Sequence, residues 1–176
     1  MRAWHRLSGA LLSVVAMLAL VGCANAEPGV VAYVGDTRIT QEELDRAVAG
    51  VSATLAEGQQ VSREAVINAM IHGALAEQIA ADRNIKVTDA QREELIRTSE
   101  LAGLLAVPDA RSIAFDVADQ QIVAQRLGAE AYLNEVRDRP VTLNPRFGVL
   151  DPTRKLIRGD QTGSLARPVA TPAPTP

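Results

Sequence analysis

The stretch from Val30 to Val48 constrains the fold of this chain more than any other part of the sequence. It opens with an apolar run that is mostly β-branched or aromatic, which is typical of a β-strand. Gly35 and Asp36 come next and indicate a turn, because glycine tolerates a positive φ and aspartate can bond to its own backbone. The chain then returns through Arg38 and Ile39. The stretch therefore predicts a β-hairpin.

A helix is predicted directly after this hairpin. Thr40 is a typical N-cap residue, and Glu43 three positions later completes a capping box. Up to about Gly58, apolar side chains recur at spacings of three and four residues, which gives the helix one apolar face. Because a hairpin alone is only marginally stable in water, we expect later segments to cover it.

Two further helices are marked by their ends. Ser62 caps the second, which carries an apolar stripe wide enough for a central helix and ends near Asn84. Asparagine tolerates the left-handed conformation that often follows a helix. Thr88 and Gln91 form another capping box, which starts a third helix that runs to about Leu101.

A fourth helix is predicted from about Asp109 to Pro140, with Gly128 as a candidate kink inside it. Residues 141–143 are extended and partly β-branched, and a turn over residues 144–148 follows them. The fold class that follows is mainly α, with about four helices and a small β element.

Residues 1–22 are predicted to be a signal peptide and not part of the fold. Arg2, His5 and Arg6 give a positively charged start, and residues 10–21 give an apolar segment of signal-peptide length. This segment is too short to span a membrane comfortably.

The signal peptide ends in Leu20-Val21-Gly22-Cys23, which resembles the lipobox of bacterial lipoproteins. In that family the cysteine is acylated on sulfur, for example with palmitate, and becomes the first residue after cleavage. Cys23 is the single cysteine of the chain. The alternative is an ordinary secretory peptide cut near residues 24–26, which leaves Cys23 without a role. With two acyl chains the anchoring is stable, and we expect a lipid-anchored protein on the extracytoplasmic face of the cell membrane.

The expected organisation has four parts. Residues 1–22 are the lipoprotein signal peptide, residues 23–29 a lipid-anchored tether, and residues 30–158 the helical domain. Residues 159–176 lose all periodicity and gather prolines among small residues, which predicts a disordered Pro-rich tail.

The sequence favours binding over catalysis. The net charge of −3 without a clustered basic face argues against nucleic-acid binding. We find no phosphate loop, nucleophile elbow or metal motif, so no cofactor and no metal is expected. His72 lies near the edge of the apolar stripe of the second helix, and we expect a surface or boundary position, because no second histidine or free cysteine accompanies it in the mature chain.

Three carboxylate pairs are expected on solvated helix faces, namely Glu42 with Glu43, Glu93 with Glu94, and Asp116 with Asp119. The alternative, a two-carboxylate hydrolase, needs a convergence that the sequence does not show. Arg146, in the turn over residues 144–148, is expected to dock the C-terminal segment against the hairpin. The alternative for Arg146 is binding a substrate carboxylate.

The order of hairpin, capped helix, long apolar helix and two more helices resembles the N-terminal domain of SurA-type and PrsA-type envelope chaperones. The residues that carry the resemblance are Val31 to Gly35, Ile39-Thr40, Glu43-Leu44, the helix from Ile67 to Ile79, and the connector Ile85 to Asp89 with Gln91. The turn over residues 144–148 is similar to the tail of short actinobacterial lipoproteins with such a domain.

The resemblance implies a helical domain of the SurA N-terminal type whose terminal strands pair, so that residues 141–143 lie beside the opening hairpin. It also implies an apolar groove for unfolded polypeptide segments. Family members with peptidyl-prolyl isomerase activity carry a separate parvulin module with its own histidines. Fewer than forty residues follow Pro140 and none of them is histidine, so no isomerase activity is expected.

The first hypothesis is therefore a non-enzymatic, membrane-anchored chaperone-like protein that binds unfolded or exported polypeptides. The candidate lining residues form an apolar stretch without periodicity, and they are Leu101, Leu104, Leu105 and Val107. The alternative is that these four residues pack into the core. The second hypothesis is an accessory lipoprotein that binds one specific envelope partner.

Overall fold

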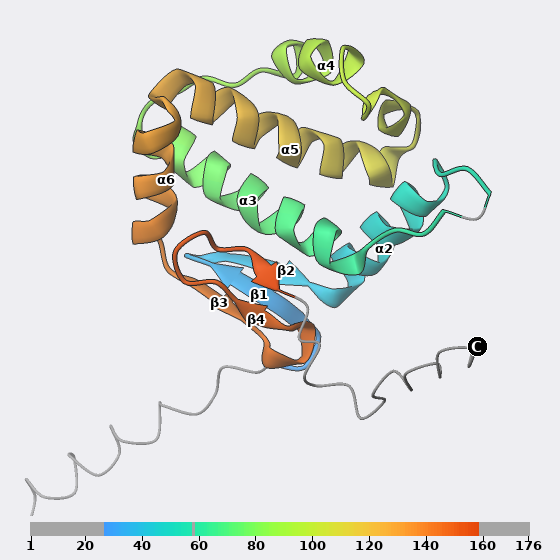
Figure 1. Cartoon of the computed structure of the whole chain (residues 1–176), viewed down its shortest axis with the longest axis horizontal. Coiled ribbons are helices and arrows are strands. Elements are labelled where there is room, and N and C mark those ends of the chain that lie inside the picture. The colour runs from blue at the N-terminus through green and yellow to red at the C-terminus, as the bar shows by residue number, and fades with distance from the viewer. Residues whose placement is uncertain (1–26, 58, 159–176) are drawn as a thin grey trace, which may run out of the picture.

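The computed structural model describes residues 27–57 and 59–158, which form a mainly helical domain with a small sheet (Figure 1). The helices are α2 (Gln41–Ser52), α3 (Arg63–Asp82), α4 (Asp89–Arg97), α5 (Pro108–Leu127) and α6 (Ala129–Asp138), with two 3-10 helices, η2 (Ala102–Ala106) and η3 (Pro145–Phe147). The strands are β1 (Val30–Val34), β2 (Thr37–Thr40), β3 (Val141–Leu143), β4 (Val149–Leu150) and β5 (Ile157–Arg158). The predicted fold class is confirmed. The signal peptide, Cys23 and the Pro-rich tail lie outside the described residues.

The three-stranded sheet joins the two ends of the domain. Its order is β2-β1-β3, and β1 is antiparallel to both neighbours, with Tyr33 opposite Arg38 on one side and Thr142 on the other. Gly35 turns the hairpin at a φ of +53°, a conformation that glycine adopts at little cost. The predicted hairpin and its pairing with residues 141–143 are both confirmed.

Asn144 fixes the C-terminal segment to β1. Its backbone N–H donates to the carbonyl of Val31 at 2.8 Å, and its side-chain Nδ2 donates to the carbonyl of Val30 at 2.9 Å. The docking contact predicted for Arg146 is therefore wrong. Arg146 is exposed, and its side chain makes no hydrogen bond or ion pair to residues 27–57 or 59–158. The buried amide of Asn144 satisfies a strand carbonyl, which a long exposed cation does not do.

The elements stack in layers, with α4 on α5, α5 on α3, and α3 on the sheet (Figure 1). Helix α3 lies at the centre because it is apolar on more than one face. Its large side chains that are at most 1% exposed are Ile67, Ile71, Leu75 and Ile79. Burying side chains of this size contributes roughly 1.5–3 kcal/mol each, so α3 supplies much of the driving force for folding.

The predicted helix starts are confirmed by their caps. Thr40 Oγ1 accepts from the N–H of Glu43 at 3.2 Å, and the carboxylate of Glu43 accepts from the N–H of Thr40 at 2.8 Å. Thr88 and Gln91 form the same reciprocal pair. Asn84 has a φ of +55° directly after α3, as its residue type predicts.

Two helices end earlier than predicted, for one physical reason. The hydroxyls of Ser52 and Thr54 donate to carbonyls of the last turn of α2, each at 2.7 Å. The hydroxyls of Thr98 and Ser99 do the same after α4, at 3.0 and 2.8 Å. These side chains compete with the backbone for helical carbonyls, so α2 and α4 stop before their apolar patterns do.

Gly128 divides the predicted fourth helix into α5 and α6. Its φ of +87° lies outside the helical region, and only glycine adopts it readily. The described residues consequently hold five α-helices and not about four. The break redirects the chain, and α6 leads from the end of α5 to the sheet (Figure 1).

Replacing Gly50 with alanine should destabilise the domain. A Cβ at Gly50 would lie 2.7 Å from the backbone nitrogen of Ala110 in α5, so the two helices must separate. We expect a loss of about 1–3 kcal/mol in the free energy of unfolding, measured by urea denaturation. The control is Gly103→Ala in η2, where no atom lies within 4 Å of the added Cβ and the stability should change by less than about 1 kcal/mol. Equal losses for the two variants would contradict this account of the α2–α5 contact.

Candidate functional site

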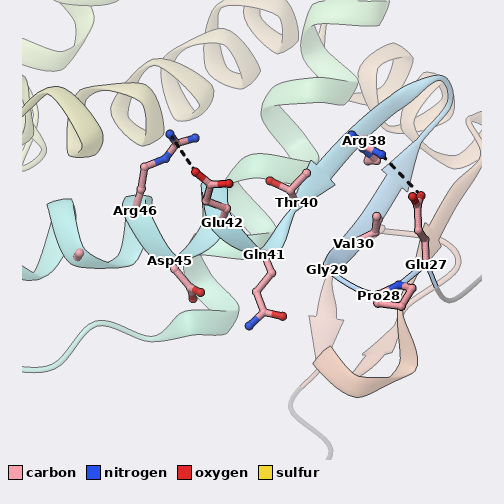
Figure 2. A pocket seen from close by; sticks show the side chains of 11 residues that line it. Glu27, Pro28, Gly29, Val30, Arg38, Thr40, Gln41, Glu42, Asp45 and Arg46 are labelled. Atoms are coloured by element: carbon pink, nitrogen blue, oxygen red, sulfur yellow. Dashed lines mark ion pairs between the residues drawn. The ribbon is translucent and has the colours of Figure 1, made fainter.

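The hairpin groove is a hollow of about 680 Å³ between the start of β1 and the first turns of α2 (Figure 2). Charged side chains dominate its wall. Arg38 Nη1 lies 3.6 Å from Glu27 Oε2, and Arg46 Nη1 lies 3.7 Å from Glu42 Oε1. Exposed ion pairs at such distances contribute little to the free energy of folding. Within each pair the positive and the negative charge offset one another. Pro28, Val30 and Ala49 also line the groove, so charged and apolar surfaces lie side by side in it.

A second hollow, the α4–α5 groove, has a volume of about 580 Å³. It is lined by Ala90, Gln91, Glu94, Leu95, Thr98, Ile122, Gln125 and Arg126. Its floor is aliphatic, because Leu95 is half-buried and Ile122 is 8% exposed. Its rim is polar. An apolar floor with a polar rim is the pattern of sites that bind apolar groups in a defined orientation.

Salt bridges hold α4 on α5 beside this groove. Arg92 donates to both carboxylate oxygens of Asp119, at 2.6 and 3.0 Å, and Arg111 pairs with Glu93. Both guanidinium groups also lie over the ring of Phe115, 5.5 and 4.9 Å from its centroid. These contacts use one side of α4. The other side, with Ala90 and Thr98, stays open to solvent.

The four residues predicted to line a peptide site lie on the far side of α4. Leu104 is 8% exposed and belongs to a small core cluster with Ile96, while Leu101, Leu105 and Val107 are half-buried against that cluster. None of them lines the hairpin groove or the α4–α5 groove. Their binding of peptide stays a prediction.

The α4–α5 groove was not anticipated from the sequence, although one signal for it exists. Leu95 and Ile96 are adjacent, so they point about 100° apart on a helix. Ile96 is 2% exposed in the small core cluster, and Leu95 packs against that cluster and also lines the groove. Two neighbouring apolar residues on a short polar helix thus mark a second apolar face.

Asp116 lies at the crossing of α3 and α5, beside a cavity of about 330 Å³ that also contacts α2. Burial, helped by the nearby Asp119 and Glu77 and opposed by Arg92, raises the pKa of its carboxyl to about 8. The prediction that Asp116 and Asp119 lie on a solvated face is wrong, because both are half-buried. Packing against α3 and α4 covers this side of α5.

His72 is 6% exposed, so the predicted surface or boundary position is also wrong. The β4–β5 segment covers the edge of α3 on which His72 lies. Neither ring nitrogen makes a hydrogen bond within the described chain. No acid or nucleophile accompanies the imidazole, and a triad requires such partners.

Two absences hold for the part of the chain that the structure describes. Residues 27–57 and 59–158 contain no group of three or more histidine, cysteine, aspartate or glutamate side chains arranged to hold a metal ion. Within the same ranges, no helix is both long enough and apolar enough to cross a membrane.

A family model described as a SurA-like N-terminal domain matches residues 3–138, which is most of the chain. The match includes the hairpin and helices α2 to α6, and it ends before β3. No curated protein and no solved structure matches the chain.

Replacing Asp116 with asparagine should change how stability depends on pH. Between about pH 4 and about pH 8 the folded protein keeps a proton on this carboxyl that the unfolded chain has lost. The free energy of unfolding therefore falls as pH rises across this interval, by up to about 1.4 kcal/mol per pH unit, and is constant above it. Asp116→Asn should remove this slope.

Urea denaturation across the interval tests this expectation, and Asp138→Asn on the exposed face of α6 serves as the control. The control should keep the wild-type slope. Parallel curves for wild type and Asp116→Asn would show that the carboxyl ionises alike in the folded and unfolded chains.

Proposed function

Because the chain belongs to the family of SurA-like N-terminal domains, we propose that it is a chaperone-like protein that binds unfolded or exported polypeptides without catalysing a reaction on them. The family is chaperone-related, and binding of polypeptides in general follows from membership. The finer proposal is that acyl groups on Cys23 anchor the protein to the extracytoplasmic face of the cell membrane. No residue is assigned a catalytic role.

The α4–α5 groove is the observation that carries this proposal. Its lining on α4 extends from Ala90 to Thr98, a length of about 12 Å at roughly 1.5 Å per residue. An extended client advances about 3.3 Å per residue, so the groove accommodates three or four residues. Its volume of about 580 Å³ is of the size that binds compact apolar groups. A short aliphatic run in an unfolded polypeptide fits these limits.

The position of the groove supports binding away from an anchored end. Glu27 is the first described residue, and it follows Cys23 by four residue steps, which span at most about 14 Å. The sheet that follows this entry and helix α4 lie at opposite ends of the domain (Figure 1). A protein anchored through Cys23 would hold its sheet near the membrane and its α4–α5 groove toward the compartment.

The hairpin groove favours a second candidate function. Its wall combines charged side chains with a few apolar ones, and such a mixed surface fits the surface of a folded protein (Figure 2). The protein would then be an accessory lipoprotein with one envelope partner. A pull-down separates the two functions, because one stoichiometric partner indicates the accessory role and a spread of unfolded clients indicates the chaperone role.

Replacing Ala90 with glutamate should weaken binding of unfolded clients. Ala90 is exposed in the first turn of α4, where glutamate is compatible with the helix, so the change adds charge and bulk to the groove without affecting folding. We expect a protein that consists of residues 24–176 to suppress the aggregation of a denatured client when the two are mixed at stoichiometric ratio. Ala90→Glu should lower its affinity for the client roughly tenfold, a cost of about 1.4 kcal/mol.

The matched control is Ala131→Glu, which places the same charge on an exposed first-turn alanine of α6, away from both grooves. This variant should bind the client as wild type does. Equal weakening by both variants would remove the α4–α5 groove from the proposal, and a wild-type protein that suppresses no aggregation would overturn the chaperone role.

A further inference from the structure

The short hairpin of β4 and β5 is docked on α3 through one side chain. Asn68 Oδ1 accepts from the backbone N–H of Ile157 at 2.7 Å, and Asn68 Nδ2 donates to the carbonyl of the same residue at 3.5 Å. The side chain of Ile157 is 6% exposed and belongs to the main hydrophobic core. The hairpin is therefore fastened by this amide and by the apolar packing of Ile157 and of Leu150 in β4.

His72 lies one helical turn beyond Asn68, on the same side of α3. It is 6% exposed, and neither ring nitrogen has a hydrogen-bond partner in the described chain. Burial lowers its pKa below the ordinary value. The nearby backbone carbonyl groups of Arg154 and Lys155 raise the pKa, but by less than burial lowers it.

No carboxylate of the described residues pairs with His72. The hairpin turn brings the backbone carbonyl groups of Arg154 and Lys155 close to the ring. Within four residues of His72, α3 itself carries no titratable side chain. From α5, Asp116 packs against Gly73, but no carboxylate of the described chain shifts the pKa of His72. While the hairpin is docked, a proton on the imidazole would meet two backbone carbonyl groups but no carboxylate, and burial outweighs the effect of the two carbonyls.

The hairpin has internal hydrogen bonds that do not involve α3. Asp151 N–H donates to the carbonyl of Leu156 at 2.8 Å, and Lys155 N–H donates to the carbonyl of Asp151 at 2.9 Å. The carboxylate of Asp151 accepts from the N–H groups of Thr153 and Arg154, both at 2.8 Å. These bonds do not involve α3, so they need not break when the hairpin leaves it.

We propose that the β4–β5 hairpin is a cover on α3 that acid releases, with His72 as the residue that takes up the proton. At neutral pH the imidazole is uncharged and stays buried. When the imidazole is protonated, the released state of the hairpin is favoured. In that state water hydrates the charged ring, whereas burying an unpaired charge is costly. Release of the hairpin exposes the apolar surface of α3 that Ile157 covers. The proposal does not depend on the α4–α5 groove or on client binding.

The direction of the pH effect follows from linkage. A histidine whose pKa is lowered in the docked state binds more protons in the released state. Docking is thus strongest above the ordinary histidine pKa of about 6.5, and it weakens as pH falls below that value. The loss is at most about tenfold in the docking equilibrium per pH unit, since one proton is involved.

Amide hydrogen exchange of the full chain in detergent tests the proposal, at about pH 7.5 and about pH 5.5 with rates corrected for intrinsic exchange. Protection of the Ile157 N–H should fall by up to about tenfold at the lower pH, while that of Val123 in α5 stays constant. His72→Leu keeps an apolar group of similar size and should abolish the pH dependence. Asn68→Ala should lower protection at both pH values and keep the difference between them.

Histidine titration by NMR keeps the proposal testable should His72→Leu not fold. The chain has two histidines, so the His72 signal is assigned by comparison with a His5→Gln variant. A His72 pKa below that of His5, together with the pH-dependent protection of Ile157, supports the cover. Unchanged protection of Ile157 at the two pH values, or pH dependence that persists in His72→Leu, would overturn it.

Discussion

The close approach of α3 and α5 is the contact on which the other elements depend. At this crossing the carboxyl of Asp116 packs against Gly73, and a Cβ at Gly73 would lie 2.4 Å from its Oδ1. Gly50 of α2 meets the backbone of α5 in a similar way. Helix α5 is thus enclosed on two sides by helices that approach it at glycines. The part of the α5 surface that stays accessible is therefore determined by its side chains and not by its backbone.

This arrangement explains why the open groove lies between α4 and α5. Helix α4 rests on the remaining side of α5 through the Arg92–Asp119 and Arg111–Glu93 pairs, which are polar contacts near the surface. These pairs fix the orientation of α4, and Ile96 of α4 packs beside them in an apolar cluster with alanines of α5. The α4–α5 groove around Leu95 and Ile122 is the part of this interface that neither the ion pairs nor the cluster fills.

Features that depend on local physics could be predicted from the sequence. The capping boxes at Thr40 and Thr88 and the left-handed Asn84 involve residues within three positions of each other, and all appear as predicted. The candidate site could not be predicted in the same way. The burial of His72 and Asp116 depends on segments far away in sequence, and periodicity shows only that a side chain lies at the edge of a stripe. The terminal strand pairing was anticipated only through a family resemblance.

The pairing of β1 with β3 has a consequence for the order in which the parts of the chain can fold. Asn144 closes the edge of β1 from a position 114 residues later in the sequence. Contacts of such long range form late in folding, because the chain between them must first be ordered. A chain that enters its compartment N-terminus first would present β1 with one unpaired edge until nearly the whole domain had followed. The first segment to emerge would be among the last to be secured, and until then its edge would be open to pairing with other chains.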